Sequence, residues 1–196
     1  MCSSDLDNGN ENFTIRKLGV MMWKHSAINE HKCFSLHDCF ISSARIENES
    51  ICAKGLRLGE YCLVFDDGFW VLPNTPYHQS PDMIRTGKAE VHIQGEVDVD
   101  CDVTLHAPVR LFNQTILTLL DSMTLKKWTD DVNSAKQCYE IIKTYHDDTT
   151  MLIHGAVHSR RAAIGKTQER FEVCISSVKI MQVVYSWDVL RPDCTW

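Results

Sequence analysis

Two adjacent histidine–aspartate pairs, His37-Asp38 and His146-Asp147, are the residues whose types could do chemistry most directly. Hydrolysis by two metal ions needs several His and Asp side chains that converge on one point. One hypothesis is therefore a metal-dependent hydrolase with these four ligands. In an extended strand, however, neighbouring side chains point to opposite faces. The alternative is that His37 or Asp38 bonds backbone groups at the start of the strand expected from Phe40.

Other motifs that carry chemistry are missing from the sequence. The nine cysteines include no Cys-x-x-Cys pair, which a zinc ribbon or a redox site would need. No Gly-x-Ser-x-Gly elbow occurs, and the phosphate-loop-like end at 164–167 lacks the earlier glycine because position 160 is Arg. The sequence therefore gives no reason to expect a catalytic residue or a cofactor outside the His-Asp pairs.

The longest regular pattern is in residues 89–105, where apolar residues occupy odd positions and polar, mostly acidic residues occupy even ones. A period of two predicts a half-buried β-strand. A straight strand of this length would measure about 55 Å, so the segment must bend, bulge or turn, and Gly95 is the expected position.

This acidic face leaves three interpretations open. Its carboxylates are Glu90, Glu96, Asp98, Asp100 and Asp102. They could be a solvated strand face that prevents edge-to-edge aggregation. Alternate carboxylates stand about 7 Å apart, so they could supply part of a calcium site. They could also form a docking surface for a basic protein partner, with like charges that steer it.

Composition limits the class of protein. With 196 residues, 44% hydrophobic and 23% charged, the chain suits one globular domain, and its net charge of −6 argues against binding to nucleic acid or to an anionic membrane. An odd number of scattered cysteines predicts reduced thiols in a cytoplasmic protein. The polar segment 1–12 contains no secretory signal and is expected to be disordered. The single domain is expected to span 13–196.

The order of the elements predicts an α+β fold. Strands are expected over 40–46, 51–58 and 109–120, and a hairpin over 61–72 around the turn Asp66-Asp67-Gly68. A twisted antiparallel sheet, or a partly open barrel, would then carry a helical pair on one face.

The helical pair is expected in the region 124–148. Thr124 can cap the first helix. The apolar face of this helix consists of Leu125, Trp128 and Val132. The second helix is expected to begin at Ala135 and to end at 146–148. Its apolar residues are Cys138, Ile141, Ile142 and Tyr145.

One short segment resembles a group of known proteins. The string Leu36-His-Asp-Cys-Phe-Ile41, followed by a strand pair and the turn Asp67-Gly-Phe-Trp70, is similar to the His-Asp-Cys/Ala-x-Ile/Leu openings of small β-rich bacterial proteins of unknown function. Some of these are grouped with the immunity proteins of polymorphic toxin systems. The resemblance covers residues 36–72 and brings no catalytic residue. It implies a bacterial cytosolic protein that binds a partner such as a toxin.

Three functions follow from these observations. The first is a non-enzymatic cytosolic interaction protein, of the immunity type, that binds a basic partner through the acidic face. The second is the metal-dependent hydrolase that uses the His-Asp pairs. The third is a structural module that forms oligomers through exposed aromatic residues on a flat sheet.

Overall fold

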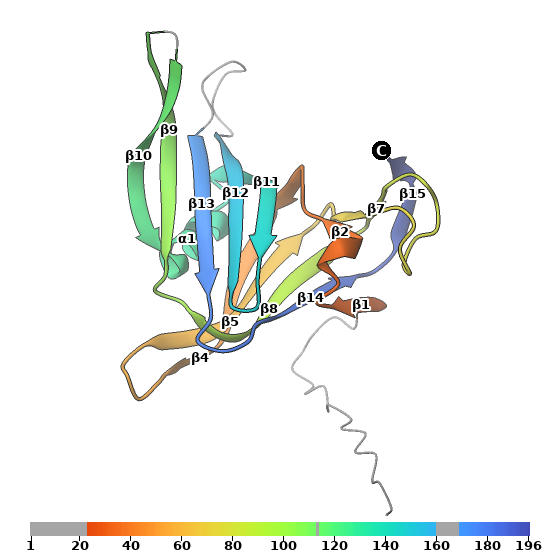
Figure 1. Ribbon diagram of the computed structural model, residues 1–196, viewed down its shortest axis with the longest axis horizontal. Coiled ribbons are helices and arrows are strands. Elements are labelled where there is room, and N and C mark those ends of the chain that lie inside the picture. The colour runs from red at the N-terminus through yellow and green to blue at the C-terminus, as the bar shows by residue number, and fades with distance from the viewer. Residues whose placement is uncertain (1–22, 113, 160–168) are drawn as a thin grey trace, which may run out of the picture.

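The computed structural model describes residues 23–112, 114–159 and 169–196, and three antiparallel sheets account for most of these residues (Figure 1). The N-terminal segment 1–12, for which disorder was predicted, lies outside the described residues. No helix in the described ranges has the length and apolar character needed to cross a membrane.

The two larger sheets have five and six strands. The five-stranded sheet has the order β1 (His25–Ile28), β14 (Gln182–Trp187), β8 (Ala89–Asp98), β5 (Arg57–Phe65) and β4 (Ser43–Ile51). The six-stranded sheet has the order β10 (Gln114–Thr124), β9 (Asp102–Leu111), β13 (Glu169–Ser176), β12 (Thr150–Ser159), β11 (Gln137–His146) and β3 (Cys39–Ile41).

The remaining elements are short. The four-stranded sheet has the order β15 (Leu190–Thr195), β7 (Ile84–Thr86), β6 (Trp70–Val71) and β2 (Phe34–Ser35). A single turn of 3-10 helix, η1, spans His31–Cys33. The one α-helix of the described ranges, α1 (Leu125–Asn133), contacts β4 of the five-stranded sheet and β9, β10 and β11 of the six-stranded sheet.

The core forms where α1 meets both sheets. Trp128 is fully buried, and its ring lies 5.6 Å from the rings of Tyr139 and Phe171 and 6.4 Å from the ring of Tyr61. Tyr61 belongs to the five-stranded sheet, and the other two rings belong to the six-stranded sheet. Burial of large aromatic side chains is among the strongest stabilising contributions in a core. Trp128 therefore holds the two sheets together.

The predicted α+β fold with a helical pair is wrong, because only the first helix forms. Thr124 caps it by accepting the Lys127 N–H at 3.3 Å, as predicted. The second segment is strand β11, which pairs with β12 and β3. A bulge between Ile141 and Lys143 adds one residue to the strand and interrupts its alternation. With this extra residue, Ile141 and Ile142 are both apolar, and the apolar residues of the segment recur at the spacing of a helix.

Two predicted strand arrangements also differ. The turn at Asp66-Asp67-Gly68 forms, with the Gly68 N–H bonded to the Phe65 carbonyl at 3.1 Å. No hairpin follows, because β6 pairs with β2 and β7 instead of β5. The strand predicted over 109–120 is divided between β9 and β10, and Phe112 adopts a positive φ of 54° where the chain reverses.

The acidic stretch 89–105 is extended, as its alternation predicted, but it forms two strands. In β8 the odd residues Ala89, Val91, Ile93 and Val97 are fully buried. Gly95 has a φ of 138°, and the pairing of β8 with β5 is irregular at this point. The chain then turns after Asp98, and β9 enters the other sheet.

Removal of the Trp128 side chain should destabilise both sheets together. We expect Trp128→Ala to lower the free energy of unfolding by about 3–5 kcal/mol, since it leaves a cavity between them. Trp128→Phe should cost clearly less, because it keeps most of the ring contact and removes a buried indole N–H that has no hydrogen-bond partner. Urea unfolding measures both, with Lys127→Ala on the exposed side of α1 as the control. Equal losses for Ala and Phe would contradict this account.

Candidate functional site

The predicted acidic residues are distributed over two sheets and a turn. Glu90 is on β8, where its side chain is only 13% exposed. Arg45 binds both Glu90 oxygens, at 3.0 and 2.9 Å, and the Trp23 indole N–H donates to the same carboxylate at 3.2 Å. The negative charge of a carboxylate held by two hydrogen bonds from one guanidinium is neutralised within the chain. Glu90 therefore offers little charge to a partner.

The other four carboxylates lie around the turn that joins β8 to β9. Glu96 pairs with Lys179, and Asp100 lies 3.5 Å from Arg57. Asp98 accepts the backbone N–H of Asp100 at 3.0 Å, and Asp102 is exposed at the start of β9. The five residues do not form one sheet face. Their role in docking a basic partner stays a prediction.

The two His-Asp pairs are not brought together. His37 and Asp38 pair with each other, with Nδ1 and Oδ1 3.0 Å apart, on the exposed segment before β3. Asp147 accepts the N–H groups of Thr149 and Thr150 at 2.8 Å, and these bonds lower the pKa of its carboxyl group. Among the described residues, these four side chains contribute to no group of three ligand atoms within 4.8 Å.

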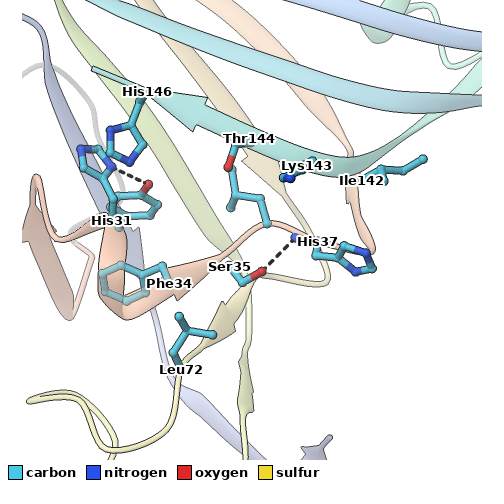
Figure 2. A pocket seen from close by; sticks show the side chains of 11 residues that line it. His31, Phe34, Ser35, His37, Leu72, Ile142, Lys143, Thr144 and His146 are labelled. Atoms are coloured by element: carbon cyan, nitrogen blue, oxygen red, sulfur yellow. Dashed lines mark hydrogen bonds between the residues drawn. The ribbon is translucent and has the colours of Figure 1, made fainter. Parts of the chain in front are cut away.

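His37 and His146 do line one cavity, together with His31. Figure 2 shows His31 and His146 side by side at one end, with His37 on another wall. The cavity has a volume of about 500 Å³, which is within the range of small-molecule sites. Its lining residues are His31, Phe34, Ser35, Leu36, His37, Leu72, Ile142, Lys143, Thr144, His146 and Tyr185.

Burial favours the neutral form of the two neighbouring histidines. Their ring centroids lie 3.3 Å apart, and the Tyr185 hydroxyl lies 3.0 Å from Nδ1 of His31. Burial, and then the neighbouring His146, lower the pKa of His31 from 6.5 to about 4. Burial also lowers the pKa of His146. Neutral imidazoles can accept protons, and the lining residues include Ser35 and Lys143 but no carboxylate or thiol.

A third feature, which the sequence analysis missed, is an exposed apolar hairpin at the end of the six-stranded sheet. Figure 1 shows β9 and β10 extending beyond the neighbouring strands. Between 39% and 98% of the surface of each of its large apolar residues is exposed. We call this set the apolar arm: Val109, Leu111, Phe112, Ile116, Leu117, Leu119 and Leu120. The composition of 109–120 was visible in the sequence, but a buried strand has the same composition.

The arm has few neighbours in the described part of the chain. Within the described ranges β9 pairs with β13 from Val103 to His106, and the described partner of the rest of β9 is β10. Isolated two-stranded hairpins are marginally stable in water. In the register of β9 with β10, Val109 and Ile116 lie on one face of the ribbon, and Leu117 and Leu119 lie on the other. Exposed apolar surface marks sites of protein or membrane interaction.

Comparisons of the chain with protein-family models, with curated proteins and with solved structures gave no match.

The histidine pair should make the stability of the protein depend on pH. The unfolded chain binds a proton at His31 near pH 6.5, whereas the folded chain does so only near pH 4. Stability should therefore fall as the pH decreases from 6.5 to 4. We expect His31→Gln to make this decrease smaller, measured by urea unfolding at pH 7 and pH 5.

Nuclear magnetic resonance titration tests the cause. The pKa of His31 should rise above 4 in His146→Gln but stay below 6.5, because burial is the larger of the two causes. Titration of His31 near 6.5 in the wild-type protein would show that the pair is not held neutral.

Proposed function

We propose that this chain is a protein-interaction module that works as a homodimer, in which the apolar arm of one copy pairs with the arm of a second copy. The observation that supports this proposal is the exposure of seven large apolar side chains on a two-stranded hairpin. Complete burial of a fully exposed large apolar side chain contributes about 1.5–3 kcal/mol, and the half-exposed members of the arm would contribute less. A hairpin that leaves all of them in water is a site that a partner would cover.

The backbone of β10 offers the means of pairing. β10 is the last strand of the six-stranded sheet, and its outer edge has no strand partner among the described residues. Natural sheets protect such edges with charged residues or by keeping the strand short. β4, at the edge of the other large sheet, carries Arg45, Glu47 and Glu49. β10 has eleven residues and no charged residue from Gln114 to Leu120.

The sequence of β10 also favours a second copy as the partner. Two β10 strands that pair antiparallel about Thr118 would place Leu117 opposite Leu119 of the other copy. The same register would place Ile116 opposite Leu120 and would set Thr118 opposite itself on the two-fold axis. Apolar pairs and threonine pairs are favourable across strands, and no like charges would meet. A two-fold axis of this kind gives a closed dimer.

Charge substitution at the two leucines tests the dimer. We expect the double variant Leu117→Glu/Leu119→Glu to raise the dimer dissociation constant at least about 100-fold. It would remove the two apolar Leu117–Leu119 contacts across the two-fold axis and set like charges opposite each other. Sedimentation velocity and light scattering measure the loss. The fold should persist, because both side chains are exposed in the single chain.

A complementary variant makes the test specific. Leu117→Lys/Leu119→Lys should also be monomeric alone, whereas an equimolar mixture of the Glu and Lys variants should regain the mass of a dimer. Ile180→Glu is the matched control, since Ile180 is 75% exposed outside the arm. A wild-type chain that is monomeric at every concentration tested, or a mixture that stays monomeric, would contradict the proposal.

A further inference from the structure

Three side chains on neighbouring strands of the five-stranded sheet gather at one point. They are Glu47 on β4, Glu60 on β5 and His92 on β8. Nε2 of His92 lies 3.4 Å from Oε2 of Glu47 and 3.7 Å from Oε2 of Glu60. Among the described residues, this is the group in which three His, Cys, Asp or Glu ligand atoms lie within 4.8 Å of one another.

The strand register places two negative charges against each other here. Glu47 and Glu60 are direct partners in the pairing of β4 with β5. Like charges directly opposite each other destabilise a sheet. Of the nearby groups, Glu47, Glu60 and Glu90 carry three negative charges, and Arg45, which binds Glu47 and Glu90, carries one positive charge. The cluster is therefore left with a formal charge of −2, which one divalent cation would neutralise.

The imidazole of His92 adds an independent observation. Its Nε2 atom is buried and has no hydrogen-bond partner. The two carboxylates lie within ion-pairing distance of it, but neither makes a hydrogen bond with it. Most buried side-chain polar atoms in proteins are bonded to a protein group or to water. A buried ring nitrogen between two carboxylate oxygens is the arrangement that a metal ion needs.

The distances agree with tetrahedral coordination. Zinc binds His nitrogen and Glu oxygen at about 2.0–2.2 Å, which places tetrahedral ligand atoms about 3.3–3.6 Å apart. The separations of 3.4 and 3.7 Å are close to this range. Arg45 binds the other oxygen of Glu47, and Asn48 donates to Oε2 of Glu60 at 2.8 Å. Such outer partners orient metal ligands.

We propose that Glu47, Glu60 and His92 bind a divalent first-row transition metal of the zinc type on the outer face of the five-stranded sheet. The ion would join β4, β5 and β8. The three side chains are between 22% and 35% exposed, so an ion can reach them from solvent. Three protein ligands leave a coordination position for water or for an anionic group.

Titration of the full chain with Zn²⁺ and with Co²⁺ tests this site. We expect one equivalent to bind and to raise the melting temperature, since a ligand of the folded state stabilises it. The chain has nine cysteines that could also bind zinc. The visible spectrum of the Co²⁺ complex distinguishes the two cases, because the proposed site has no thiolate and should show no sulfur charge-transfer band.

Ligand variants complete the experiment. His92→Gln and Glu60→Gln should each weaken binding at least about tenfold. Glu60→Gln should also stabilise the metal-free protein, because it removes a like charge opposite Glu47, an effect that a lost structural contact would not produce. His154→Gln is the matched control, since His154 lies 3.3 Å from Glu172 on the other sheet without a third ligand. Wild-type affinity in His92→Gln, a thiolate spectrum, or no binding at all would overturn the proposal.

Discussion

The contact of Trp128 with rings from both large sheets is the interaction on which the rest of the structure depends. It lies where α1 contacts both sheets. Burial changes along β10 close to the helix. Met123, one residue before the capping Thr124, is buried, whereas residues 114–122 of the same strand are exposed. The apolar arm begins where the six-stranded sheet passes beyond the reach of this core, so its exposure is a consequence of where the helix sits.

The outer surface of the five-stranded sheet follows a second constraint, the matching of charge. Glu90 is more deeply buried than the carboxylates near it, and it has the most complete set of partners, with both oxygens bound by Arg45. Burying a carboxylate without such partners would cost several kcal/mol. Glu47 and Glu60 depart from this rule because the strand register sets them opposite each other. Their one close neighbour without a hydrogen bond is His92, which is an ordinary metal ligand in its neutral form.

The sequence pattern predicted correctly those elements that short-range features such as capping and periodicity determine. Thr124 and the spacing of Leu125, Trp128 and Val132 were sufficient for α1, and the alternation in 89–98 was sufficient for β8. The failures have non-local causes. The bulge at Ile142 gave β11 a helical spacing, and only its pairing with β12 and β3 reveals the strand. The turn at Gly68 was visible, but no local feature says that β6 pairs with β2 and β7.

The candidate sites were harder to predict for the same reason. The carboxylate of Glu90 reads as free charge in the sequence, because its partner Arg45 is 45 residues away. The sequence around Phe112 and the leucines of β10 is that of a buried strand. Composition alone does not show whether another sheet or helix packs on that strand. Each proposed site has a feature that the described residues leave uncompensated. The arm exposes apolar side chains, and Glu47 and Glu60 place two negative charges opposite each other. The free energy of unfolding is a small difference between large opposing contributions. Exposed apolar surface or unpaired negative charge therefore takes away a noticeable part of it. Pairing with a second copy would cover apolar side chains of the arm. A divalent cation would neutralise the charges of Glu47 and Glu60.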